Sequence, residues 1–147
     1  VVLDGEEVVI VARSDATRLM AYGLHLGARL PVHATSTGRV LLAAQSEAWL
    51  QAWLNGRTFT RLTPHTVTDA EQVRQRVAQA RREDHALSVD EHELGVSALS
   101  VPLRNMQGAV CAALNVVLPT SIMGADEIRQ LFLPHLQVAA QTLRSVL

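Results

Sequence analysis

Cysteine, aromatic residues and long apolar runs are scarce in this sequence. Its 147 residues include one cysteine, and aromatic residues make up 3%. The single Cys111 excludes a disulfide within the chain and is compatible with a reducing compartment, so we expect a cytoplasmic protein. No apolar run approaches the roughly 20 residues that a membrane-spanning helix needs, and no signal peptide is visible, so we expect no membrane partner.

An excess of charge of one sign is also lacking. Thirteen basic and fourteen acidic residues give a net charge of −1, and no stripe of basic residues is present. Binding to nucleic-acid phosphates needs such a stripe, so we expect this stretch not to bind DNA by itself. The length suits one domain with one core. Because the chain begins with Val1 in place of methionine, we expect it to be part of a longer protein.

The apolar pattern of the first half predicts strands followed by helices. Asp4-Gly5 lies between two β-branched runs and predicts a tight hairpin turn. Alternation over residues 18–26 predicts a third strand, which Gly27 and Pro31 end. A helix is expected after the hydroxyl-rich residues 35–37, Ser46 is expected to cap a second helix that carries Trp49 and Trp53, and 57–67 is expected to be a loop.

The second half predicts a helix, three strands and a final helix. Thr68 and Glu71 form a T-x-x-E capping box, which predicts a helix to about Asp84 with a solvated arginine-rich face. The expected strands cover 86–89, 96–103 and 109–118, with a turn at 105–108; the third is so apolar that we expect it to be covered on both faces. The last helix, from about Asp126, has an apolar face.

This order of elements predicts the fold class. No connection between consecutive strands is long enough for a parallel crossover, so an antiparallel sheet with helices packed on it is expected. The fold class is therefore α+β.

The stretch HATSTG at 33–38 is the strongest candidate for a site. The first turn of a helix leaves amide groups unpaired and carries partial positive charge, so adjacent hydroxyls would favour a carboxylate or another anion. Gly38 would let a ligand approach the backbone. The alternative is that one hydroxyl caps the helix and the other two are merely small and polar.

Three other groups of residues contain side chains that could carry chemistry. Asp90, Glu91, His92 and Glu93 contain metal-ligand types, but their spacing favours a solvated turn or strand end, and HELGV lacks the second histidine of HExxH. Cys111 is expected to be a buried structural thiol, and the two tryptophans are expected in a core or a subunit contact. No complete catalytic set is visible, so we expect neither an enzyme nor a cofactor or metal site.

Several segments together resemble a known family. GARLPVHATSTGRVLLA, an arginine-rich helix, DEHELGVSALSVPLRNMQGAVCAALNVVLP and a leucine-rich last helix resemble the C-terminal effector-binding domain of IclR-type bacterial transcriptional regulators. The resemblance covers nearly the whole chain, 1–147, and implies a GAF-like domain with a roughly six-stranded antiparallel sheet. It also implies an N-terminal winged helix-turn-helix that this chain lacks, and association into homodimers or homotetramers.

The resemblance also implies a ligand pocket. It would bind a small-molecule carboxylate effector, and operator DNA would be bound only through the missing domain. The residues carried over are Leu19, Met20, Tyr22, Ser36, Thr37, Ser88, Val96, Ala98, Asn115 and Val117.

The expected chemistry of this pocket narrows the effector. Several members of the family have an acid near the position of Ser88 and a hydroxyl or thiol near Ala98, so this pocket is less polar and less suited to a short oxoacid. HATSTGRVLLA with AALNV is most similar to the branch that senses aromatic acids such as protocatechuate or 4-hydroxybenzoate.

Two other functions stay open at this point. One is a small hydrolase or transferase that uses His33 as base and Ser36 as nucleophile, since three residues of separation could bring them together on a turn. The other is a GAF-like dimerisation module without a ligand.

Overall fold

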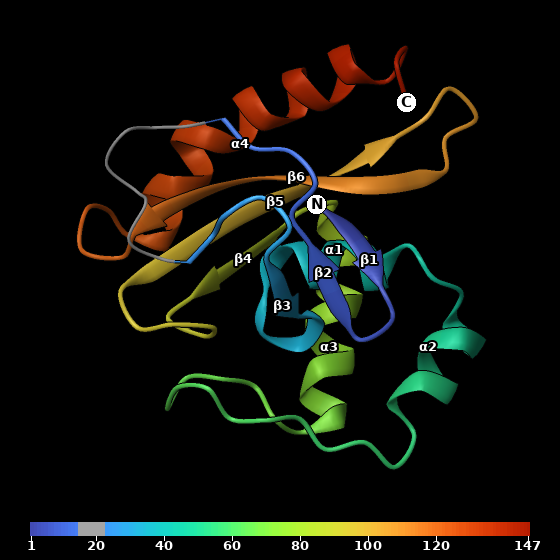
Figure 1. Cartoon of the computed structure of the whole chain (residues 1–147), viewed down its shortest axis with the longest axis vertical. Helices are drawn as coiled ribbons and strands as arrows, with labels where there is room; N and C mark the ends of the chain where they lie inside the picture. The colour runs from blue at the N-terminus through green and yellow to red at the C-terminus, as the bar shows by residue number, and fades with distance from the viewer. Residues whose placement is uncertain (15–22) are drawn as a thin grey trace.

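The computed structural model describes residues 1–14 and 23–147, and its architecture confirms the α+β class. One antiparallel sheet has the strand order β1-β2-β3, from Val2–Asp4, Glu7–Val9 and Arg29–Pro31; the other has the order β4-β5-β6, from Ala86–Val89, Val96–Arg104 and Val110–Pro119. The helices are α1 (Ser36–Ala43), α2 (Glu47–Leu54), α3 (Ala70–Glu83) and α4 (Ala125–Leu143), and the 3-10 turn η2 (Val32–Ala34) precedes α1 (Figure 1).

The six strands form two three-stranded sheets in place of the single sheet expected. The sheets meet where Val1 and Ala113 exchange backbone hydrogen bonds of 3.0 and 2.8 Å. This one residue pair puts β1 beside β6, so the strands follow the spatial order β4-β5-β6-β1-β2-β3. The family expectation of six antiparallel strands thus holds, but the ladder between β6 and β1 is a single pair.

The first hairpin is confirmed, and the described part of the predicted third strand is not strand. Gly5 has a φ of +64° in the turn between β1 and β2, the conformation that a tight hairpin requires. Residues 18–22 of the expected strand lie outside the described residues, and 23–26 are not strand. Strand β3 is Arg29–Pro31, and its proline is tolerated because β3 is an edge strand.

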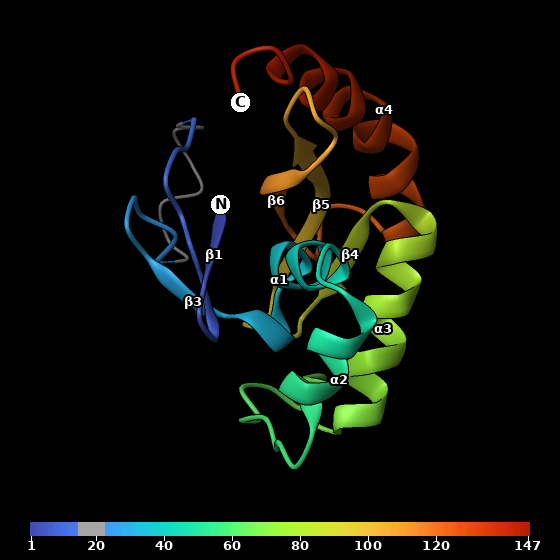
Figure 2. The ribbon, with the colours of Figure 1, turned by 90° about the vertical axis from the view of Figure 1, so that its right-hand side faces the viewer.

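Helix α1 lies between the two sheets. Figure 2 shows β1 and β3 on one side of α1, with α3 and α4 forming the opposite side of the molecule. The main apolar core gathers around α1 and includes Val40, Leu41 and Leu42 together with Val8 of β2 and Val77 of α3. A short helix in this position is buried on almost every side.

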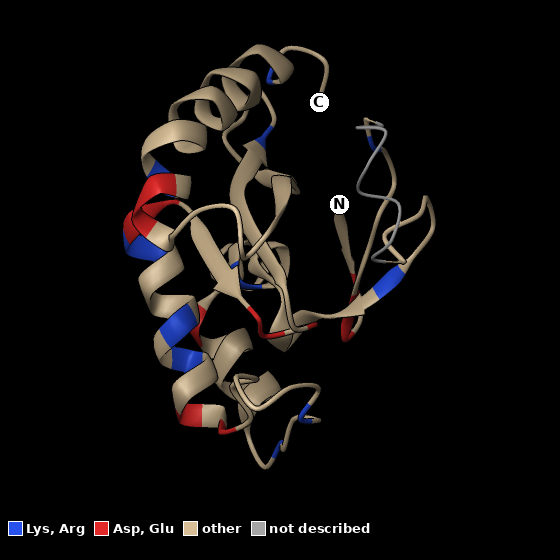
Figure 3. Cartoon of the chain, turned by 90° about the vertical axis from the view of Figure 1, so that its left-hand side faces the viewer, with Lys and Arg blue, Asp and Glu red and all other residues tan. Residues whose placement is uncertain are grey.

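The capping box at the start of α3 was wrong in detail. Asp69 is the N-cap, and its carboxylate accepts the Gln72 amide at 3.0 Å; Glu71 instead pairs with Arg74. The cap is Asp69 and not the preceding Thr68, and either residue type can cap a helix. Figure 3 shows charges of both signs along the outer side of α3, as expected of a solvated face.

Strand β6 and helix α4 are less buried than predicted. Only Ala112 and Ala113 are buried in β6, and Cys111, expected to be buried, is exposed because it is the extra residue of a bulge opposite Leu103 and Arg104. In α4 only Ile128 is buried, and Pro134 lies inside the helix. No helix among the described residues is long and apolar enough to span a membrane.

Candidate functional site

The site begins with the residues that start α1. The Thr35 hydroxyl accepts the Gly38 amide at 3.2 Å and donates to the Pro31 carbonyl at 3.2 Å, so one of the three hydroxyls is the helix cap. The amides of Ser36 and Thr37 belong to the first turn, where no carbonyl of the helix can pair with them. Their positive ends are the anion-attracting part of the predicted site.

Gly38 permits a close contact between α1 and η2. A Cβ at this position would lie 2.0 Å from the Val32 carbonyl oxygen and 2.7 Å from two other backbone atoms of that residue. Its role is therefore to pack helix against turn, whereas the sequence suggested that it let a ligand approach. The same contact fixes the direction in which the first turn of α1 points.

Ser36 connects α1 to the second sheet. Its Oγ lies 2.6 Å from Oγ of Ser100 on β5, and both side chains are fully buried. The face of the sheet that carries Ser100 is therefore the face turned toward α1. Ser100 was missed by sequence reasoning, since a lone serine in an alternating strand carries no signal of its own.

Strand register shows which predicted residues share that face. Residues directly opposite one another in a sheet point to the same side, and residues two apart along a strand do so as well. Six predicted or newly found residues therefore lie on the α1 side of the sheet: Ser88, Val96, Ala98, Ser100, Asn115 and Val117. The structure thus brings the strand residues of the predicted pocket together with Ser36.

This face combines apolar surface with polar atoms. Val96, Ala98 and Val117 are partly exposed and offer apolar surface. The side chains of Thr37, Ser88 and Asn115 have no hydrogen-bond partner within residues 1–14 and 23–147. Thr37 and Ser88 are buried as residues, but their hydroxyl oxygens are not fully enclosed, so they stay accessible to a ligand. A ligand with an aromatic body and polar ends matches this combination.

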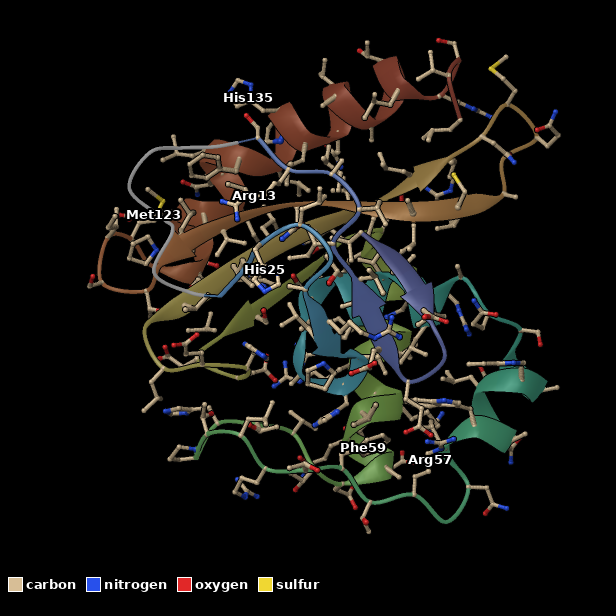
Figure 4. The ribbon with its side chains drawn as sticks, in the orientation of Figure 1. Arg13, His25, Arg57, Phe59, Met123 and His135 are labelled. Carbon is tan, nitrogen blue, oxygen red and sulfur yellow. The ribbon has the colours of Figure 1, made fainter. Side chains whose placement is uncertain are left out.

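The remaining predicted residues, Leu19, Met20 and Tyr22, lie outside the described residues. The segments on either side of them run together: Ile10 pairs with Gly27 and Ala28, and the Arg13 guanidinium donates to the Leu24 carbonyl. Figure 4 shows Arg13 and His25 on these two segments.

A buried ion pair lies one helical turn beyond Ser36. The Arg39 guanidinium makes two hydrogen bonds with the Glu91 carboxylate, one of them 2.9 Å long, and the two side chains are only 4% and 10% exposed. Glu91 was predicted to lie in a solvated turn or strand end, which was wrong because the guanidinium compensates its buried charge. The family motifs contain both residues, but they are 52 positions apart and only the fold pairs them.

Asp90 has a structural role. It adopts a φ of +57°, and its carboxylate accepts the Gly95 amide at 2.7 Å and the Thr120 hydroxyl at 3.0 Å. No cluster of three or more metal-ligating side chains occurs in the part of the chain that the structure describes.

His33 has other partners than Ser36. Its Nε2 donates to the Thr60 carbonyl at 2.9 Å, and its ring stacks on Phe59 with centroids 4.9 Å apart. Phe59 in turn meets Trp53, which stacks on Trp49 of α2. Figure 4 shows Phe59 on the segment after α2, at the end of the molecule away from α4. In the hydrolase hypothesis His33 is the base and Ser36 the nucleophile, but His33 bonds to Thr60 and Ser36 bonds to Ser100, so the two do not form a pair.

His92 is the titratable group of this region with a perturbed pKa. Burial lowers its pKa because the charged form loses hydration, and His33 adds to the effect, whereas Glu93 opposes it. Its side chain is therefore held toward the neutral form.

Comparison with known proteins identifies the family. Residues 1–145 match the family model described as the bacterial transcriptional regulator IclR C-terminal domain. The chain belongs to this family, and the resemblance seen in the sequence is confirmed.

Individual relatives refine the comparison. The chain is 43% identical to the Pca operon regulatory protein and 42% identical to the p-hydroxybenzoate hydroxylase transcriptional activator, both of Acinetobacter baylyi. Each alignment covers 99% of this chain, and 54% and 56% of the two relatives. The chain therefore spans about half the length of the curated relatives it matches.

Solved structures show the same fold. The inducer-binding domain of a double mutant of PobR from Acinetobacter, in complex with 3-hydroxybenzoic acid, superposes with a TM-score of 0.92 at 42% identity, covering 99% of this chain and 86% of that one. An IclR homologue of Microbacterium hydrocarbonoxydans, in complex with 4-hydroxybenzoate, gives 0.83 at 29% identity, covering 97% and 57%. The chain is thus the effector-binding part of an IclR-type regulator.

Proposed function

We propose that this domain binds an aromatic carboxylate of the hydroxybenzoate type. The observation that carries the proposal is the Ser36–Ser100 hydrogen bond, because it joins the first turn of α1 to the sheet face that carries apolar and unpartnered polar side chains. In the proposed mode, the carboxylate takes the first-turn amides with the hydroxyls of Ser36 and Thr37. The ring lies against Val96, Ala98 and Val117, and Ser88 and Asn115 bind polar ring substituents. Leu19, Met20 and Tyr22 remain proposed contacts from the family resemblance.

Relatives support this proposal. The two domains of known structure described above were solved with 3-hydroxybenzoic acid and 4-hydroxybenzoate, and the relative at 42% identity activates a p-hydroxybenzoate hydroxylase gene according to its name. These relatives are transcriptional regulators, so we propose that the ligand is bound and released unchanged, with no part for His33 in catalysis.

The full-length protein would use this binding to control transcription. We propose that a winged helix-turn-helix outside this chain binds operator DNA, and that homodimers or homotetramers of a cytoplasmic protein do so. A coupling free energy of about 1–3 kcal/mol between effector and DNA would change operator affinity roughly 5- to 150-fold. Light scattering of the purified protein would measure its oligomeric state.

Calorimetric titration with 3-hydroxybenzoate, 4-hydroxybenzoate and a short aliphatic acid tests the binding proposal. Ser36→Ala with Thr37→Ala removes two hydroxyls that would face the carboxylate. Because hydrogen bonds to charged groups contribute about 1.5–3 kcal/mol, we expect affinity for the hydroxybenzoates to fall about 10-fold or more.

Ser46→Ala is the matched control, since it removes the hydroxyl that starts α2, away from the sheet face. It should leave affinity unchanged. The methyl ester of 4-hydroxybenzoate, which lacks the negative charge, should bind more weakly than the acid. Equal binding of ester and acid, or no binding of any aromatic acid, would refute the proposed function.

A further inference from the structure

The buried pair Arg39–Glu91 connects α1 with the turn between β4 and β5. Arg39 lies three residues after Ser36, so the two side chains are neighbours on the helix surface. Its guanidinium makes the two bonds to the Glu91 carboxylate and a third, at 3.3 Å, to the Leu87 carbonyl of β4. The start of α1 is therefore held to the sheet at two points. Ser36 bonds to Ser100 of β5, and Arg39 bonds to the Leu87 carbonyl of β4 and to Glu91 just after this strand.

The Glu91 end of the pair is itself held in place. The Glu91 carbonyl accepts the Thr66 hydroxyl at 2.7 Å, and the Asp90 carbonyl accepts the Thr63 hydroxyl. The Asp90 carboxylate adds its bonds to Gly95 and Thr120, described above. Arg39 thus contacts a turn that is held by hydroxyls of the loop 57–67 and by bonds to Gly95, just before β5, and Thr120, just after β6.

We propose that Arg39 and Glu91 are positioning residues for the effector, which they do not themselves contact. The pair sets the height and tilt of the first turn of α1 over the sheet face, so affinity depends on the geometry of its two parallel bonds. A planar guanidinium with two bonds fixes orientation, whereas a single ammonium supplies only a point charge. A site that is already in place before binding loses less free energy on ordering. This inference rests on the proposed function.

Two variants separate positioning from simple stability. Arg39→Lys keeps the charge and loses the two-bond geometry. Arg39→Met with Glu91→Leu replaces the whole buried pair by apolar side chains, a change that often leaves stability unaltered. We expect the double variant to melt within a few degrees of the wild type. We also expect both variants to bind 4-hydroxybenzoate about tenfold more weakly by calorimetry. Glu91→Gln keeps the volume but leaves the Arg39 charge buried without a counter-ion, so this third variant should melt below the wild type. Its affinity is compared with its melting temperature in the same way.

The matched control is the exposed pair Arg104–Asp84, which also has two bonds, at 2.9 and 2.5 Å. Asp84→Asn breaks it, and asparagine tolerates the φ of +56° at this position. Affinity should not change in this control.

Each outcome decides the inference. The positioning role is supported if the wild type binds and the double variant binds more weakly while it melts at the normal temperature. The inference is overturned if the wild type binds and the folded variants bind with unchanged affinity. It is also overturned if affinity follows melting temperature alone across the series. In both cases the proposed function remains. A wild type that binds no hydroxybenzoate overturns both.

Discussion

Helices α1 and α4 are both amphipathic in sequence, yet they are used in opposite ways. Seven of the eight residues of α1 are buried, from Ser36 to Leu42, whereas α4 buries only Ile128 among its 19 residues. Helix α1 lies between two sheets and against α3, while α4 lies on the outer side of the second sheet (Figure 2). The apolar pattern therefore shows which side of a helix faces the protein interior. How many of its sides are buried depends on the topology of the fold.

The difference extends to charged side chains. Arg39 of α1 is nearly inaccessible and is paired with Glu91, whereas Arg129 of α4 lies 3.3 Å from an almost fully exposed Asp126. A buried pair that loses one partner leaves a costly charge behind, but an exposed pair contributes little. Substitutions on α1 should thus lower the stability of the whole domain, whereas the same substitutions on α4 should change it little.

The largest effect is expected at Gly38. Gly38→Ala would place a Cβ 2.0 Å from the Val32 carbonyl oxygen, so helix and turn must move apart. Because backbone atoms must give way, the loss in the free energy of unfolding should exceed the roughly 1–3 kcal/mol typical of overpacking. Chemical denaturation measures it.

Gly124, which precedes α4, is the control for this substitution, since a Cβ there meets nothing within 4 Å. Gly124→Ala should change stability by less than about 1 kcal/mol. Equal losses for the two glycines would show that the contrast between the helices is not real.

A second pair of substitutions removes leucine side chains. Leu42 on α1 is fully buried, and Leu42→Ala should cost about 3 kcal/mol by lost burial and the cavity left behind. Leu131 on α4 is 55% exposed, and Leu131→Ala should stay within about 0.5 kcal/mol. Urea titrations of both variants give the comparison. A large loss at Leu131 would mean that α4 is covered by another surface in solution.

The smallest effect concerns pH. Because the pKa of His92 is lowered in the folded domain, the unfolded chain binds a proton more readily. Its contribution to stability is therefore complete above the ordinary histidine pKa of about 6.5 and is lost as the pH falls toward the folded pKa.

His92→Gln should reduce the drop in melting temperature between neutral and mildly acidic buffer. If His92→Gln melts with the same pH dependence as the wild type, the burial of this side chain has no thermodynamic consequence.

Local signals in the sequence predicted most elements, and long-range contacts account for the failures. Asp4-Gly5 and Ser46 mark a hairpin and a helix start by chemistry confined to a few residues, and both are confirmed. Strand β3 was not predicted at Arg29–Pro31, because its position depends on pairing with β2, in which Arg29 lies opposite Val9 and Pro31 opposite Glu7. The site shows the same division.

At the site, the helix start with its hydroxyls was visible in the sequence. Ser100 as the partner of Ser36, and Glu91 as the partner of Arg39, were not, because these pairs are 64 and 52 residues apart. No periodicity or motif spacing in the sequence predicts a contact between residues so far apart. The burial of Glu91 could be known only once Arg39 was seen beside it.

The chain of rings from Trp49 through Trp53 and Phe59 to His33 has a practical consequence. It contains both tryptophans of the protein, and it ends two residues before the residue that caps α1. Tryptophan fluorescence therefore comes from a single region next to the helix start. A change in emission on adding a hydroxybenzoate would be an optical record of events there, without any attached dye.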